Sequence, residues 1–202
     1  MAETRNVVAG LVIGGVVLAG MVGFVLSGDE AASESGSGTL AMPDSIAPDF
    51  TPLDLAREDQ GAAGAEQAEQ QVRNREYAEG VLADVLDMPV GVRTYADPAF
   101  DSYLTVQAFR GEGGPFVPLT LPDPEVLGVE KAQSELVRRG EQTCIRSWQT
   151  VPLGEEVVPE EDLLAVTCQL TLDGLTVRAG GSNVTEDEVV DAVQEVWDGL
   201  AE

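Results

Sequence analysis

The two cysteines are the residues whose type and spacing point most directly to a chemical role. Cys144 and Cys168 are the only cysteines of the chain, and both lie in segments rich in β-branched residues, a composition typical of strands. If these segments pair as an antiparallel hairpin in which Val151 faces Glu161, the two cysteines lie opposite each other. Because two cysteines in one small domain outside the cytoplasm usually pair, we predict a structural disulfide between them.

A reactive or metal-binding pair of thiols is the alternative interpretation of these cysteines. It requires a CxxC spacing or basic neighbours that lower the pKa of the thiols, and the sequence offers only Arg146. The spacing therefore favours the disulfide.

Acidic residues are the other candidates for chemistry, because the chain contains no histidine. That absence excludes a Ser-His-Asp triad, a Cys-His dyad and any histidine-ligated metal. A hydrolase with two facing carboxylates is the alternative function that the sequence allows. The densest acidic groups are Glu155-Glu156, Glu160-Glu161-Asp162 and Glu186-Asp187-Glu188. Acidic runs are usually solvated surface, so we predict no catalytic residue, no cofactor and no metal ligand.

The charge of the chain limits its partners. Its 202 residues include 11 basic and 36 acidic side chains, which give a formal net charge of −25. Nucleic acid is excluded as a partner, because neutralising a phosphate backbone requires lysine and arginine. Neither GxGxxG nor GxxxxGK[ST] occurs, so nucleotide binding has no support in the sequence.

An uninterrupted apolar segment, residues 7–26, lies close to the amino terminus. At about 1.5 Å per residue its helix is roughly 30 Å long, which matches the hydrocarbon core of a bilayer. Arg5 precedes it and acidic residues follow it, so we expect residues 1–6 in the cytoplasm and the remainder outside. The alternative is a cleaved signal peptide with its cleavage site after Ala31-Ala32-Ser33, which yields a secreted protein.

Small residues recur along this predicted membrane helix, and such rows let two helices approach closely. They indicate a homodimer through the helix as one option, although glycine is also common in membrane helices generally. The candidate helix–helix contacts are Gly10, Gly14, Gly15, Ala19 and Gly23.

Residues 27–67 are rich in Ser, Gly, Ala and acidic residues, and we predict a disordered acidic linker there. One apolar patch interrupts the linker; it can dock on the domain or on a partner, although such a patch is more often a local turn that packs loosely. Its residues are Ile46, Phe50, Leu53 and Leu55.

Residues 68–202 are long enough for one domain with its own core. Hydrophobic periodicity and turn residues predict the order α-β-β-α-β-β-β-α, an α+β fold with an antiparallel sheet and about three helices on one face. The predicted helices cover 68–88, 125–139 and a segment after Thr185; the predicted strands cover 90–95, 103–110, 143–151, 163–172 and 175–179.

Two local motifs fix the end of this domain. Asp173-Gly174 lies between apolar strands and predicts a type I′ hairpin that places Leu172 opposite Leu175. Thr185 and Glu188 have the spacing of a capping box, which predicts the start of the last helix.

The long loop 111–124 contains four prolines, three glycines and Phe116. An aromatic residue in such a loop can contact a partner, and the alternative is that Phe116 packs into the domain. Taken together, the sequence predicts a single-pass membrane protein with a non-catalytic interaction or sensing domain outside the cytoplasm. We expect its partners to be the bilayer and another protein of the cell envelope.

Overall fold

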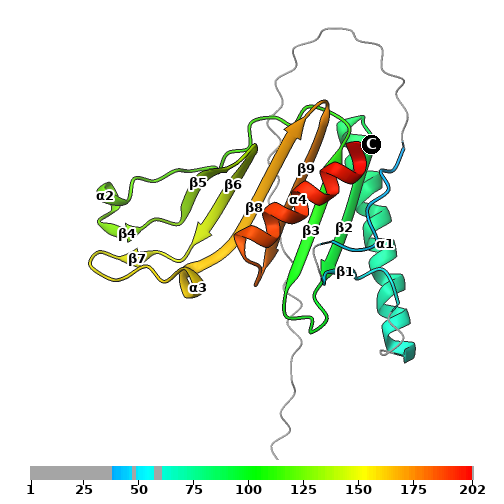
Figure 1. Cartoon of the computed structure of the whole chain (residues 1–202), viewed down its shortest axis with the longest axis horizontal. Helices are drawn as coiled ribbons and strands as arrows, with labels where there is room; N and C mark the ends of the chain where they lie inside the picture. Colours follow the sequence, from blue (N-terminus) through cyan, green and yellow to red (C-terminus); the bar gives the residue numbers. More distant parts are fainter. Residues whose placement is uncertain (1–37, 47–48, 57–60, 202) are drawn as a thin grey trace, which may run out of the picture. The chain divides into compact units, whose positions relative to one another are not determined.

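A computed structural model describes residues 38–46, 49–56 and 61–201 of the chain (Figure 1). All of these residues belong to one unit, Ser35–Glu202. The predicted membrane segment 7–26, with its candidate helix–helix contacts, lies outside the described residues. The strands are β1 (Thr51–Pro52), β2 (Val90–Ala96), β3 (Tyr103–Phe109), β4 (Val129–Lys131), β5 (Ser134–Arg139), β6 (Gln142–Trp148), β7 (Val151–Pro152), β8 (Leu163–Leu172) and β9 (Leu175–Ser182). The helices are α1 (Gly61–Leu86), α2 (Pro124–Leu127), α3 (Pro159–Asp162) and α4 (Glu186–Ala201).

An antiparallel sheet of seven strands forms the centre of the fold, in the order β1-β2-β3-β9-β8-β6-β5. Strands β4 and β7 form a separate two-stranded sheet. Because every named strand pair is antiparallel and helices pack beside the sheet, the fold is α+β, as the sequence predicts.

The hydrophobic core lies between α4 and one face of the large sheet. Figure 1 shows α4 crossing the middle strands, and it contacts β3, β8 and β9. The apolar stripe of α4 includes Val189, Val193 and Val196, all at most 1% exposed. They pack with sheet residues such as Val106 and Val177, both fully buried.

Both local motifs of the carboxyl-terminal part are confirmed. Asp173 and Gly174 have φ values of 52° and 71°, and Leu172 pairs with Leu175 in the predicted register. The Thr185 amide donates to the Glu188 carboxylate, and the Glu188 amide donates back to the Thr185 hydroxyl. Short-range sequence signals therefore determine this hairpin and the start of α4.

The predicted helix over 125–139 is wrong. Gly128, at φ 66°, ends α2 after a single turn, and the chain continues as β4 and β5. Residues of β5 pair along β6, with Val137 opposite Cys144. Pairing with a strand that follows in the sequence overrides the local helical pattern, and it changes the predicted element order.

The prediction that the helices share one face of the sheet is also not met. Helix α4 covers the face described above, whereas α1 packs against β2, the second strand from one edge of the sheet (Figure 1). Helix α1 buries its small residues Gly64 and Ala68, while its larger apolar residues Val81 and Val85 are 43% and 59% exposed.

The predicted disordered linker, residues 27–67, differs from the structure in its second half. Ile46 and Phe50 are 1% and 4% exposed and belong to the core, β1 adds to the edge of β2, and α1 begins at Gly61. Two of the four residues of the apolar patch therefore pack in the core, whereas Leu55 is 46% exposed. The prediction fails there because two buried side chains and the pairing of β1 with β2 compensate the entropy cost of ordering this segment. The amino-acid composition alone does not reveal these contacts.

Candidate functional site

The disulfide predicted from the sequence is present between Cys144 of β6 and Cys168 of β8. The two residues are direct partners across the antiparallel pair, with Cα atoms 4.1 Å apart and both side chains fully buried. Val151 and Glu161, however, do not face each other as this register predicts. A bulge after Ser147 shifts the pairing, and Val151 leaves β6 to pair with Lys131.

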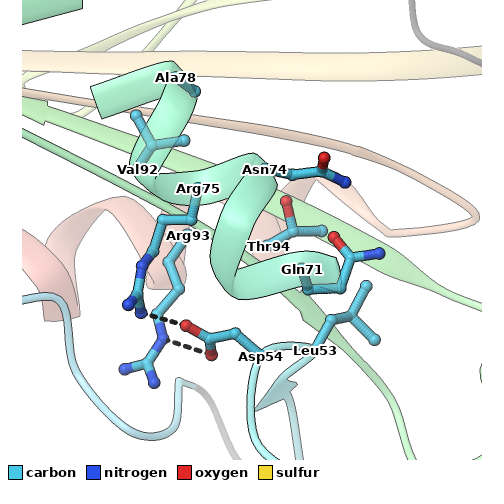
Figure 2. Close-up of a pocket in the computed structure, with 9 residues that line it drawn as sticks. All are labelled: Leu53, Asp54, Gln71, Asn74, Arg75, Ala78, Val92, Arg93 and Thr94. Atoms are coloured by element: carbon cyan, nitrogen blue, oxygen red, sulfur yellow. Dashed lines mark hydrogen bonds and ion pairs between the residues drawn. The ribbon is translucent and has the colours of Figure 1, made fainter. Parts of the chain in front are cut away.

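A buried ion-pair network joins three parts of the chain that lie far apart in sequence. Asp54 accepts hydrogen bonds from Arg75 of α1 and from Arg93 of β2, the latter at 2.9 Å (Figure 2). The side chains of Asp54 and Arg93 are 4% and 8% exposed. Arg93 also donates to the carbonyl oxygens of Met42 and Pro43. The network therefore holds residues 42–44 and Asp54 against the sheet.

The surroundings of Arg93 and Tyr95 shift the pKa values of both residues. Burial by itself disfavours the charged guanidinium of Arg93, but the hydrogen-bonded carboxylates of Asp44 and Asp54 outweigh it and raise the pKa. Burial also raises the pKa of Tyr95, whose hydroxyl donates to the Pro43 carbonyl at 2.9 Å. Arg93 therefore stays charged and Tyr95 stays neutral near neutral pH.

A hollow of about 130 Å³ lies beside this network. Figure 2 shows the amide side chains of Gln71 and Asn74 along it, with Thr94 of β2 behind them. Asp54, the carboxylate in its wall, is already paired with two arginines. The hollow can admit water or a small polar group, and the ion pairs beside it serve to clamp α1 to β2.

A single glutamate next to the hollow has a raised pKa. Burial disfavours the charged form of Glu79 and outweighs the hydrogen bond that its carboxylate accepts from the Val92 amide at 3.0 Å. This contact satisfies a backbone donor on β2 that no strand pairs.

A second ion-pair network ties the start of α4 to β5 and β6. Glu186 accepts hydrogen bonds from Arg139 and Arg146, and Arg146 also contacts Glu135 at 3.3 Å. Burial opposes the charged form of Glu186, but these two arginines outweigh it, so its pKa lies below the ordinary value. The carboxylate also lies in the first turn of α4, where the helix dipole favours negative charge.

Several of the acidic residues considered for a hydrolase have structural or exposed positions. Glu186 belongs to the network just described, and Glu188 caps α4. Glu155 and Glu156 are exposed in the loop after β7. Asp162 accepts a hydrogen bond from the Val158 amide. Within residues 38–46, 49–56 and 61–201, no group of three or more acidic or cysteine side chains is placed to hold a metal ion.

The sheet face opposite α4 has a different chemistry from the rest of the surface. The register places no Asp or Glu at its strand positions, whereas the chain as a whole has 36 acidic residues. Arg178 and Arg138 are the charged residues at these positions. The other polar side chains on this sheet face are mostly threonines and glutamines: Thr94, Thr105, Thr143, Thr167, Thr171, Thr176, Gln107 and Gln169.

The loop after β3 crosses this face and is fixed to it by hydrogen bonds. The Gly113 amide donates to the Thr176 hydroxyl at 2.7 Å, and that hydroxyl donates to the Gly111 carbonyl at 2.9 Å. A Cβ at Gly113 would lie 2.9 Å from side-chain atoms of Thr171 and Thr176, so this close approach requires glycine.

The loop brings Phe116 over Arg178. The guanidinium carbon of Arg178 lies 4.8 Å from the centre of the Phe116 ring, and Phe116 is partly buried. The predicted loop aromatic is therefore packed on the domain with part of its surface accessible. Its role as a partner contact stays a prediction.

The arginines at these sites were not identified from the sequence. Arg93 and Arg178 each lie within an apolar strand, in VGVRTYA and LTVRAGGS, and a lone charge in such a strand is a signal that it has a specific environment. Asp54 lay in a segment assigned to the linker, so nothing in the sequence connected it to either arginine.

Comparison with known proteins gives no relative to which a function could be traced. No family model matches the sequence, and no curated protein or solved structure matches at a significant level. Among the described helices, none combines the length and apolarity that a membrane span requires.

Large apolar side chains are exposed on a part of the fold that we call the arm, residues 117–130 and 151–158. It contains α2, β7 and the first two residues of β4, elements that Figure 1 shows together beyond β5 and β6. Five of its apolar residues are between 55% and 83% exposed: Leu119, Leu121, Val126, Leu127 and Leu153. The arm also carries five acidic residues, and the lysine that directly follows residue 130, Lys131, is paired with Glu135.

Proposed function

We propose that the chain is a single-pass membrane protein that presents a non-catalytic binding domain outside the cytoplasm. The proposed binding surface is the arm. Its occupant is a protein of the cell envelope with an apolar groove bordered by lysine and arginine.

The membrane attachment rests on the sequence. Residues 7–26 are long and apolar enough to span a bilayer, and Arg5 lies on the side expected to face the cytoplasm. The disulfide supports the same orientation, because disulfides form in oxidising compartments and are rare in the cytosol.

The arm is the observation that carries the binding role. Monomeric proteins rarely expose several large apolar side chains together, and such surfaces usually mark interaction sites. Leu119 and Val126 are each 83% exposed, and Leu153 is 72% exposed. The five carboxylates beside them repel anionic lipid and favour a basic partner, because complementary charge steers association.

Membrane topology is tested with the full chain in cells. A reporter enzyme that is active only outside the cytoplasm, fused after residue 202, should be active, and the protein should resist a carbonate wash of the membranes. Release by carbonate supports the secreted form instead. A fusion that is active only in the cytoplasm contradicts the proposal.

The arm is tested by photo-crosslinking in the same cells. A photoreactive residue at Leu153 should give an adduct with one protein, and the same residue at Tyr77, an exposed aromatic of α1, serves as the control. The protein identified by mass spectrometry is then purified, and its affinity should fall at least about tenfold with Val126→Ser and Leu153→Ser combined, since each removes buried apolar contact. Adducts with lipid alone, or equal adducts from both positions, contradict the proposed occupant.

A further inference from the structure

Arg178 is a half-buried arginine that no acidic residue neutralises. It lies on β9, in the sheet face opposite α4, and no carboxylate of the described part of the chain lies within ion-pair distance of it. Glu112 and Asp123, the acidic residues of the loop 111–124, are both exposed. Arg110 and Arg138 also lack a carboxylate partner among the described residues, but both are exposed, whereas Arg178 is half-buried and therefore requires an explanation.

The guanidinium group is positioned by only two neighbours. Its Nε and Nη2 atoms donate to the Oε1 atom of Gln169, at 3.2 and 2.7 Å. Gln169 is 6% exposed and is oriented in turn by the Thr171 hydroxyl at 3.3 Å. Phe116 covers one side of the guanidinium plane. An arginine has five N–H donors, so most of them remain for another acceptor.

The unused donors are accessible from solvent. Within the described residues, the Nη1 atom of Arg178 makes no hydrogen bond, yet it is not among the buried polar atoms that lack a partner. Burial lowers the pKa of Arg178, and no neighbouring charge compensates that effect. The guanidinium of Arg178 should therefore bind an anion with a more favourable free energy than a fully solvated arginine does, because part of its hydration is already lost.

We propose that Arg178 anchors a binding site for the carboxylate group of a small organic acid. The planar fork of a guanidinium matches a carboxylate with two parallel hydrogen bonds. The fixed Gln169 contact and the Phe116 ring hold that fork in one orientation before the ligand arrives, which lowers the entropy cost of binding.

The surrounding side chains define the remainder of the ligand. The register places Gln107 beside Arg178 on β3, and Thr143 beyond Gln169 on β6. These hydroxyl and amide groups suit a ligand that carries hydroxyl or amide groups next to its carboxylate. One guanidinium balances a single negative charge, and the acidic domain repels a second one, so a carboxylate is favoured over a phosphate dianion.

The test measures the side chain of Arg178 directly. The oxidised full chain, in a nonionic detergent, is titrated with N-acetylglycine, acetate, phosphate and chloride at matched ionic strength, and the arginine Nε–H resonances are followed by NMR. N-acetylglycine should shift the Arg178 resonance in a saturable manner, more tightly than acetate. The measurement is independent of membrane topology and of any protein partner, so its outcome is separate from that of the proposed function.

Two variants make the assignment specific. Arg178→Gln should weaken N-acetylglycine binding at least about tenfold, the loss expected when a charge-assisted hydrogen bond is removed. Arg138→Gln, on the same sheet face at an exposed position, should leave the binding unchanged. If Arg178→Gln does not fold, the wild-type titration still decides. Equal shifts with chloride, tighter binding of phosphate, or retained binding in Arg178→Gln overturns the proposal.

Discussion

Asp54 accepts a hydrogen bond from Arg93 at 2.9 Å across 39 positions of sequence, and both side chains are less than a tenth exposed. This contact, together with the one from Arg75, attaches the segment before α1 to the sheet. A buried ion pair stabilises a fold little more than an apolar pair of the same size does, but removing one partner destabilises it, because a buried charge is left uncompensated. The domain is therefore sensitive to substitution at a position that composition places in a linker.

Substitution Asp54→Asn should lower the free energy of unfolding by about 3 kcal/mol, because it leaves the buried Arg93 with only the exposed Asp44 as a charged partner. Urea denaturation followed by tryptophan fluorescence measures it. Asp49→Asn is the control, because Asp49 lies in the same segment and is exposed. Equal effects of the two substitutions would show that the buried pair contributes nothing specific.

Loss of the disulfide should destabilise the domain. The double substitution Cys144→Ala and Cys168→Ala opens a link between residues 24 positions apart, and the chain-entropy model gives a loss of about 3.5 kcal/mol. Urea unfolding of the variant against the oxidised wild type measures the difference. In addition, the exported wild type should contain no thiol that can be alkylated before reduction, and two alkylated thiols would contradict the native disulfide.

Substitution Gly174→Ala should weaken the β8–β9 hairpin. Gly174 has a φ of 71°, a conformation that costs a residue with a side chain about 1–2 kcal/mol. The midpoint of urea unfolding should fall accordingly. Gly114→Ala is the matched control, since a Cβ there meets no atom within 4 Å and its φ is not positive. A larger effect at Gly114 than at Gly174 would contradict the assigned turn.

The pH dependence of stability should include a contribution from Glu186. Its pKa is lowered in the folded state, so its charged form stabilises the domain fully above the ordinary glutamate pKa of about 4.3. This contribution is lost as the pH falls through the lower, folded-state pKa. The variant Glu186→Gln should thus be less stable than wild type at pH 7, and the difference should shrink as the pH falls below about 4.

Urea unfolding of Glu186→Gln and wild type across this pH range measures the difference. Glu141→Gln, in the exposed turn between β5 and β6, provides the control. A pH-independent difference for Glu186→Gln would show that its ion pairs with Arg139 and Arg146 do not form in solution.

The local sequence was sufficient where structure depends on neighbouring residues. Asp173-Gly174 predicted the hairpin and its register, because only that register follows from a two-residue turn. Thr185 and Glu188 predicted the start of α4 through a contact that spans one helical turn. The partnership of Cys144 and Cys168 followed from counting along two strands, although the bulge after Ser147 limits that register to the middle of β6.

Contacts between distant segments were decided only by the tertiary structure. Residues 134–139 have a helical pattern but become β5, because β6 offers a strand to pair with. Asp54 has no chemical role until folding places it between Arg75 and Arg93, and Arg178 is distinctive only because the sheet register keeps acidic residues away from it. Patterns of a few residues encode turns, caps and burial, whereas the choice of partner across a sheet depends on the free energy of the whole packed domain.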